Sequence, residues 1–217
     1  MTTFVLVPGA GGSASYWRLL VPELERRGHR ALAVGLPAAD PDAGLSAYAD
    51  AVVGTVRTAP GGSADPVVLV GQSMGGLTTP LVCDRLPVRL LVLLNAMVPS
   101  PGETGGAWWA NTGHADPGDM TAAFFADVPA DVAATVQAEP FEQADRPFED
   151  PWPLDRWPDV PTRVLAGRDD RFFPLDFQRR VARDRLGLTV DELPGGHLVA
   201  LSRPAELAEQ LVAYLDA

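Results

Sequence analysis

The sequence predicts an α/β fold: a doubly wound sheet of about six strands, all parallel, with a small helical insertion. Three observations support this prediction. Short apolar runs rich in β-branched residues alternate with longer amphipathic segments. The middle runs are apolar at every position, as in strands that helices cover on both faces. The alternation stops once, between about residues 99 and 159, where Pro, Gly, Asp and Trp are frequent.

The apolar runs define the expected strands, and the amphipathic segments define the expected helices. The strands are expected at residues 4–7, 31–34, 67–70, 90–94, 162–166 and 188–192. The helices are expected at residues 16–27, 46–58, 74–86, 175–186 and 204–215. Right-handed crossovers between strands then make the whole sheet parallel. Pro80 should bend the helix expected at 74–86, or remove one of its hydrogen bonds.

Residues 99–159, hereafter the insertion segment, are interpreted as a cap between the fourth and fifth strands. Residues 1–98 and 160–217 would then form the core in two parts. The insertion segment holds four of the five tryptophans, which favours an apolar or aromatic pocket. Trp108 and Trp109 are the candidate substrate contacts. The alternative is that these aromatic side chains only attach the cap to the core.

Composition and charge limit the partners that we expect. A chain of 217 residues fits one domain, or one domain with a small insertion. Its net charge of -11 would repel nucleic acids and anionic membranes. Cys83 is the only cysteine, so no intrachain disulfide can form. The sequence shows neither a basic leader nor an apolar run of the roughly 18 residues that span a bilayer. We therefore expect a soluble, cytoplasmic protein, whose oligomeric state the sequence does not reveal.

The motif Gly71-Gln72-Ser73-Met74-Gly75 stands directly between an expected strand and an expected helix. A G-x-S-x-G string is weak evidence alone, but this setting is that of a nucleophile elbow. Such a turn is strained and needs small residues on both sides of the serine, here Gly71 and Gly75. The alternative is an ordinary turn in which Ser73 only caps a helix. We expect Ser73 to be a nucleophile.

A serine nucleophile needs a base, and the base needs a carboxylate that orients it. His197 lies in a loop after the last expected strand, on the same sheet edge as Ser73. His29 lies on the opposite edge, and nothing in the sequence positions His114 on the core. Asp169 and Asp170 both follow the fifth strand. We expect Asp170 to be the acid and Asp169 to be a turn residue that bonds its own backbone.

The loop Pro8-Gly9-Ala10-Gly11-Gly12-Ser13 follows the first strand and is rich in glycine. It should supply one backbone N–H of an oxyanion hole, from Ala10 or alternatively from Gly11, while Met74 supplies the other. Gly11 and Phe172 are further candidates for substrate contact. Glycine-rich loops also bind phosphates, but the loop lacks the G-x-G-x-x-G spacing and the chain has no lysine. We expect no nucleotide, no other cofactor and no metal.

These motifs resemble those of the α/β-hydrolase family over nearly the whole chain. The start of the chain and its compact size are similar to the branch of small esterases and hydroxynitrile lyases. Pro8 stands where the family usually has a histidine. The resemblance implies the fold of this family, here without the two antiparallel N-terminal strands that are common in the wider family. It also implies acyl transfer on an ester of an apolar or aromatic small molecule, by Ser73, His197 and Asp170.

Other chemistries on the same fold stay open as alternatives. The context of Ser73 also resembles that of type II thioesterases, so acyl-thioester hydrolysis is the first alternative. A lyase or cyclase, or a ligand-binding protein on this fold, is the second. Hydroxynitrile lyases of the similar branch use a lysine near the triad, and this chain has none. Dehalogenases and epoxide hydrolases of the fold use an aspartate nucleophile, which Ser73 disfavours.

Overall fold

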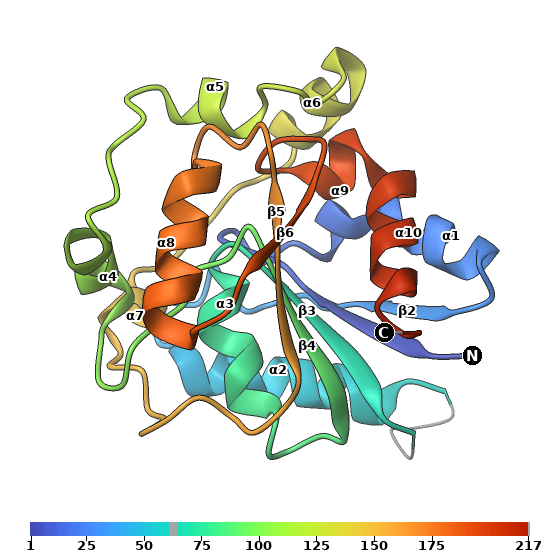
Figure 1. The fold of residues 1–217 in the computed structure, drawn as a ribbon, viewed down its shortest axis with the longest axis horizontal. Helices are drawn as coiled ribbons and strands as arrows, with labels where there is room; N and C mark the ends of the chain where they lie inside the picture. Colours follow the sequence, from blue (N-terminus) through green and yellow to red (C-terminus); the bar gives the residue numbers. More distant parts are fainter. Residues whose placement is uncertain (61–64, 217) are drawn as a thin grey trace.

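The computed structural model describes residues 1–60 and 65–216, which contain a six-stranded parallel sheet (Figure 1). The strands lie in the order β2-β1-β3-β4-β5-β6, and every pair of neighbours is parallel. Their bounds are β1 Thr3–Val7, β2 Arg30–Ala33, β3 Val67–Gln72, β4 Val88–Leu94, β5 Thr162–Gly167 and β6 Val190–Leu193. The predicted fold class is confirmed.

Side chains alternate between two apolar cores, one on each face of the sheet. In β1, Phe4 and Leu6 enter one core, while Val5 and Val7 enter the other. The first core is covered by η1 Ala14–Trp17, α1 Leu20–Arg26, α9 Val199–Ser202 and α10 Pro204–Ala213. The second is covered by α2 Leu45–Thr58, α3 Gly75–Thr78, η2 Thr79–Val82 and α8 Leu175–Leu186. Since helices cover both faces, the central strands have no polar face.

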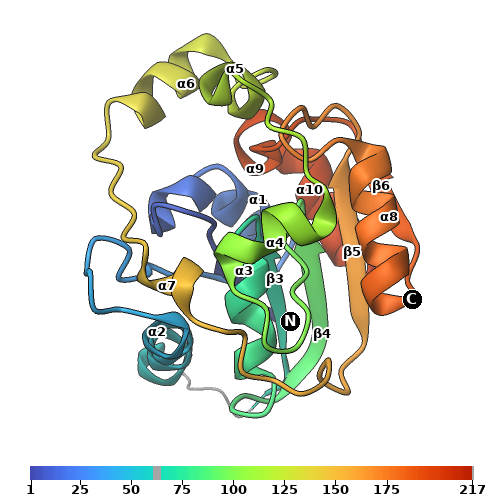
Figure 2. The same cartoon turned by 90° about the vertical axis from the view of Figure 1, so that its left-hand side faces the viewer.

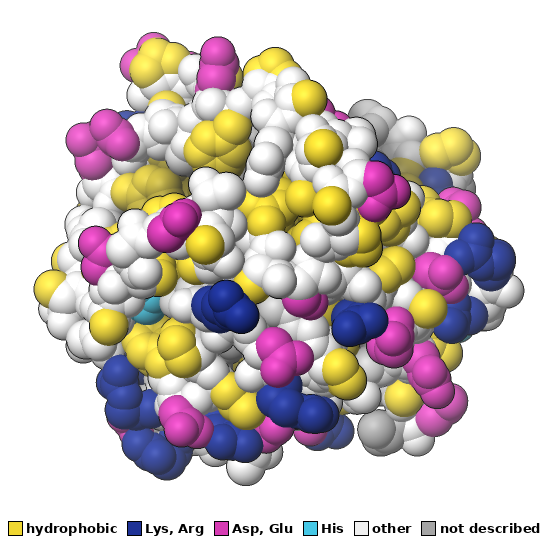
Figure 3. Space-filling view, turned by 90° about the horizontal axis from the view of Figure 1, so that it is seen from above, with side chains coloured by type: hydrophobic (Ala, Val, Ile, Leu, Met, Phe, Trp, Pro, Cys, Tyr) yellow, Lys and Arg dark blue, Asp and Glu magenta, His cyan; other side chains and the backbone are white. Residues whose placement is uncertain are grey.

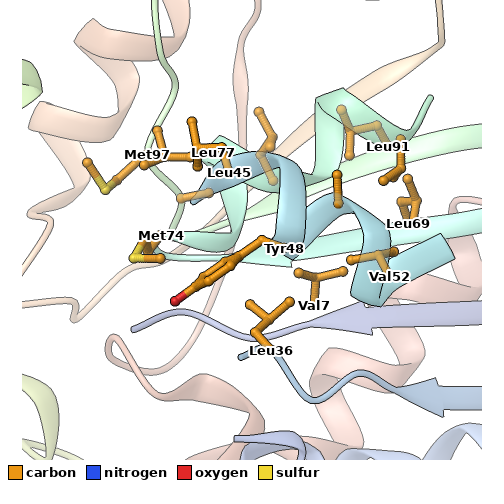
Figure 4. Packing of buried hydrophobic residues seen from close by; sticks show 14 of the residues in the cluster. Val7, Leu36, Leu45, Tyr48, Val52, Leu69, Met74, Leu77, Leu91 and Met97 are labelled. Carbon is orange, nitrogen blue, oxygen red and sulfur yellow. The ribbon is translucent and has the colours of Figure 1, made fainter. Parts of the chain in front are cut away.

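Figure 4 shows the second core around α2. Tyr48 and Val52 of this helix lie against Val7 and Leu69 of the sheet. Met74, which follows Ser73 in the chain, is 2% exposed and belongs to the same core. The turn that carries Ser73 is therefore anchored in this apolar core.

The insertion segment follows β4 and precedes β5 in the chain, and it contains four short helices (Figure 2). They are α4 Gly105–Thr112, α5 Met120–Phe124, α6 Ala130–Gln137 and α7 Arg146–Glu149. Two tryptophans attach this segment to the core. The indole of Trp108 donates to the Val98 carbonyl at 2.9 Å, and that of Trp152 to the Leu77 carbonyl at 3.1 Å. Both side chains are buried. The exact limits proposed for the three parts of the chain stay a prediction.

Two of the predicted helices are wrong in their extent. The segment expected at 16–27 is divided into η1 and α1. The helix expected at 74–86 is α-helical only to Thr78 and continues as the 3-10 turn η2. Pro80 explains the second change, because it has no N–H for the α-helical bond to Gly76. The last strand begins at Val190, two residues later than expected.

No helix among the described residues is long and apolar enough to cross a membrane. Those same residues contain no cluster of three or more His, Cys, Asp or Glu side chains arranged to hold a metal ion.

A buried ion pair joins the insertion segment to α8. Arg185 Nη2 lies 2.8 Å from Glu103 Oε1, and the two side chains are 13% and 5% exposed. Burial alone would raise the pKa of Glu103. Hydrogen bonds from Arg185, Asn111 and the Ser100 N–H outweigh burial and lower that pKa.

We predict that Arg185→Ala lowers the free energy of unfolding by about 2–3 kcal/mol at neutral pH, because it leaves a buried carboxylate without its cation. Since the pKa of Glu103 is lowered in the folded protein, the stabilisation is complete above pH 4.5 and is lost as the pH falls further. Urea unfolding of both proteins at pH 7 and pH 3.5 measures this. A difference that stays constant between the two pH values would contradict the assignment.

Candidate active site

Ser73 occupies the turn between β3 and α3 with a left-handed backbone, φ 52°. This conformation is strained for a residue with a side chain, and close packing on both sides enforces it. A Cβ on Gly71 would lie 2.6 Å from Thr79 Oγ1, and one on Gly75 would lie 2.8 Å from the Pro8 carbonyl. Glycine is therefore required at both positions. The turn has the geometry of a nucleophile elbow.

The structure brings Ser73, His197 and Asp170 together at the carboxyl edge of the sheet. Ser73 Oγ lies 3.0 Å from His197 Nε2, and His197 Nδ1 lies 2.8 Å from Asp170 Oδ2. The three residues are 9%, 0% and 4% exposed, in the order Ser73, His197, Asp170. With the proton on Nδ1 directed at the carboxylate, Nε2 is free to accept the serine proton.

Asp170 Oδ1, the carboxylate oxygen that does not contact His197, accepts hydrogen bonds from the backbone N–H groups of Phe172 and Phe173, both at 2.8 Å. These bonds hold the carboxylate toward His197. Asp169 does not bond its own backbone, contrary to expectation. Its carboxylate accepts the Gly195 N–H at 3.2 Å, and its own N–H donates to the Gly195 carbonyl. The neighbouring aspartates thus have separate tasks: Asp170 contacts the imidazole, and Asp169 supports the loop that carries it.

Three buried amide side chains connect the loops of the site, and two of them, Asn95 and Gln178, were not predicted from the sequence. Asn95, at the end of β4, donates to the Gly196 and His197 carbonyls and accepts the Gly167 N–H at 2.7 Å. Gln72 accepts the Gly9 N–H and donates to the His197 carbonyl. Gln178 donates to the Phe173 carbonyl. Asn95 also has a left-handed backbone, φ 45°, a signal that only the structure reveals.

The backbone N–H groups of Ala10 and Met74, expected to form an oxyanion hole, donate to no other group of the described residues. Gly11, the alternative to Ala10, does not share this freedom. Its N–H donates to Gln143 Oε1 of the insertion segment at 2.9 Å. Of the two candidates in the first loop, Ala10 therefore has the available donor.

Two cavities meet at Ser73. Figure 3 shows the molecule from above, on the side where α5 and α6 lie in Figure 1. The larger cavity has a volume of about 680 Å³, and its walls include Trp109, His114, Met120, Phe148 and Phe172. The smaller has a volume of about 170 Å³ and is lined by residues that include Gly11, Tyr16, Arg18, Glu139 and His197. Phe124 and Phe141 border both cavities. Burial raises the pKa of the Tyr16 phenol, which therefore stays protonated.

The predicted substrate contacts in the insertion segment need one correction. Trp108 is wholly buried and does not line either cavity, because its indole N–H is bonded to the Val98 carbonyl inside the core. Trp109 is the tryptophan that reaches the larger cavity. His114, which nothing in the sequence positioned, lies with Nε2 2.7 Å from the Phe172 carbonyl and packs against Trp109. His29 lies between α1 and β2, away from the site, as expected.

A doubly wound sheet with a serine on its strand-to-helix turn, and acid and histidine loops at the same edge, defines the α/β-hydrolase class. A model of the Alpha/beta hydrolase family matches residues 4–210, and the chain belongs to this family.

Two similar proteins match nearly the whole chain, and a third matches about half of it. The chain is 26% identical to a pyrethroid hydrolase of Sphingobium wenxiniae, over 100% of this chain and 89% of that protein. It is 27% identical to an alpha-hydroxynitrile lyase of Arabidopsis thaliana, over 97% of this chain and 95% of that protein. A probable esterase of Oryza sativa is 36% identical over 48% of this chain and 42% of its own length. The solved structure of polyneuridine aldehyde esterase has the same fold, with a TM-score of 0.81, 20% identity and 99% coverage of each chain.

The role of Asn95 leads to a prediction about stability. Asn95→Gly removes its buried hydrogen bonds and should lower the free energy of unfolding by about 2–4 kcal/mol, since Gly167 N–H and the His197 carbonyl lose partners. Asn95→Ala should cost about 1 kcal/mol more, because alanine must also adopt the left-handed backbone. Chemical denaturation of the wild-type protein and the two variants measures both losses in the free energy of unfolding. Equal stability of the two variants would disprove the backbone argument.

Proposed function

We propose that the protein is a serine-dependent carboxylic-ester hydrolase that acts by acyl transfer on esters of apolar or aromatic small molecules. The observation that carries the proposal is the continuous path from Ser73 Oγ through His197 to Asp170, with contacts of 3.0 and 2.8 Å. A serine hydroxyl is a poor nucleophile without a base in contact. This arrangement supplies the base and also the carboxylate that stabilises the imidazolium.

The proposed reaction has two stages. Ser73 Oγ attacks the ester carbonyl while its proton moves to His197 Nε2, and the N–H groups of Ala10 and Met74 stabilise the oxyanion. His197 then gives this proton to the leaving alcohol, and the acyl-enzyme remains. In the second stage, His197 takes a proton from water, which attacks the acyl carbonyl. The tetrahedral intermediate collapses, the acid leaves, and the proton returns to Ser73.

The walls of the larger cavity support the proposed substrate class. Trp109, Met120, Phe148 and Phe172 offer it aromatic and thioether surface. Apolar side chains that enclose a cavity of this size suit an apolar or aromatic group. The names of the similar proteins agree with ester chemistry, since they include a pyrethroid hydrolase and a probable esterase.

The first test of this proposal is labelling by a fluorophosphonate, in which Ser73 Oγ attacks phosphorus and fluoride leaves. We predict that the wild-type protein is labelled and that Ser73→Ala is not. The variant should also lose at least about 10³-fold in kcat on p-nitrophenyl esters, since it has no nucleophile. A well-folded wild-type protein that resists labelling would count against the proposal and favour a binding role.

Trp109→Ala tests the substrate class. We predict that kcat/KM falls about tenfold for a p-nitrophenyl ester of an aromatic or long acyl group, because the cavity loses one wall. The value for the acetate ester should change by less than about threefold. The test is the value of kcat/KM for the aromatic, the long-chain and the acetate ester. An equal fall in kcat/KM for all three would contradict a selective apolar cavity.

One similar protein supports a second candidate reaction, the cleavage of an α-hydroxynitrile. The alpha-hydroxynitrile lyase of Arabidopsis matches 97% of this chain. Cyanide release from mandelonitrile, measured beside ester hydrolysis and with Ser73→Ala as control, decides between the two reactions. Assays with acyl-thioester substrates test the thioesterase alternative in the same experiment.

A further inference from the structure

The insertion segment makes one hydrogen bond to the loop of residues 8–13, which carries Ala10. Gln143 Oε1 accepts the N–H of Gly11, at 2.9 Å. The amide of Gln143 is itself fixed, because its Nε2 donates to the Tyr48 hydroxyl at 3.1 Å and to the Ala144 carbonyl at 2.8 Å. Tyr48 belongs to α2 in the core, so Gln143 connects the core to the loop through a braced side chain.

The insertion segment makes a second hydrogen bond of the same kind to the loop that carries His197. Asp127 Oδ2, also in the insertion segment, accepts the N–H of Gly196 at 2.9 Å. Gly196 directly precedes His197, just as Gly11 directly follows Ala10. Each contact therefore lies one residue away from a group that the proposed reaction uses.

Both contacts depend on glycine. A Cβ on Gly196 would lie 2.5 Å from Asp127 Oδ1, and one on Gly11 would lie 2.6 Å from the ring of Phe141. Gly11 has a φ of 82°, and Gly195, the neighbour of Gly196, has a φ of 122°. Such backbones are flexible in isolation, because glycine has many accessible conformations. An external hydrogen bond is a direct way to select one of them.

We propose that Asp127 and Gln143 are positioning residues, through which the insertion segment holds the oxyanion donor and the base in their reactive places. This inference rests on the proposed function. The bond from Gln143 engages the N–H of Gly11 and leaves that of Ala10 directed to the oxyanion. The bond from Asp127 holds the backbone on which the imidazole is carried. The insertion segment thus completes the catalytic geometry, in addition to forming the wall of a cavity.

Misplacement of a reacting group by a fraction of an ångström to an ångström can reduce a rate by up to about 10²-fold. We therefore expect Asp127→Ala and Gln143→Ala each to reduce kcat about tenfold or more, while KM changes less than about twofold. Asp127→Asn keeps an acceptor oxygen for Gly196 and should recover most of the rate. Gln143→Glu keeps an acceptor for Gly11 and can accept from Tyr48, but it loses the bond to the Ala144 carbonyl, so it should recover only part of the rate.

The experiment measures the second-order rate of labelling by a small alkyl fluorophosphonate, together with kcat and KM on p-nitrophenyl acetate. The small reagent depends on Ser73, His197 and the oxyanion hole but makes little use of the cavity walls. Asp131→Ala and Glu142→Ala are the matched controls, because both residues belong to the insertion segment and are exposed. They should label at the wild-type rate. Urea unfolding at the assay temperature establishes that each variant is folded.

The outcomes separate this inference from the proposed function. If the wild-type protein is not labelled, the proposed function fails and the inference fails with it. If the wild-type protein is labelled and the two alanine variants react equally fast, only the inference is overturned. A rise in KM at unchanged kcat would also overturn it, since the two residues would then act only on binding. If Gln143→Ala unfolds, Gln143→Met replaces it: a side chain of similar shape without the acceptor should show the same slow labelling.

Discussion

The left-handed backbone of Ser73 is the constraint on which the rest of the site depends. A φ of 52° directs the hydroxyl away from the sheet, and it persists because the surroundings leave no alternative. The backbone carbonyl of Pro8 lies so close to position 75 that only glycine fits there. The side chain of Thr79 restricts position 71 to glycine in the same way. The strain is therefore offset by packing in the core, where Met74 is buried beside α2. The interactions that hold this turn therefore also direct the hydroxyl of Ser73, the proposed nucleophile.

Much of this arrangement could be predicted from the sequence, because it depends on local patterns. Apolar runs covered on both faces predicted a parallel sheet, and parallel strands place all of their following loops at one edge. The grouping of Ser73, Asp170 and His197 follows from that topology once each residue is assigned to a loop. The sequence favoured Asp170 over Asp169 without fixing the choice, which rests on the 2.8 Å contact between Asp170 Oδ2 and His197 Nδ1. The two aspartates differ by one position on a loop, and the conformation of a loop is not encoded in periodicity.

The insertion segment was predicted least well, for physical reasons. Its helices are short, and α6 buries no residue, so hydrophobic periodicity carries little information there. Trp108 and Trp109 are neighbours in sequence, yet one is sealed in the core and the other borders a cavity. Which of two adjacent aromatic residues faces inward depends on how the segment docks. The same applies to Asn95, Asp127 and Gln143, whose partners in the loops of the site lie 102, 69 and 132 residues away in the chain. Long-range polar contacts of this kind have no signature in a single sequence.

The site is best understood as three loops of the core whose geometry is completed by polar contacts from elsewhere in the chain. Asn95 and Gln72 act from within the core, and the insertion segment acts from outside it. A crystal structure of the protein after reaction with a small fluorophosphonate tests this account most directly. We expect phosphorus bonded to Ser73 Oγ, with the phosphonyl oxygen within about 3 Å of the Ala10 and Met74 nitrogens and with the Gly11 N–H still bonded to Gln143. A phosphonyl oxygen directed away from those two nitrogens, or adduct formation at a residue other than Ser73, would contradict it.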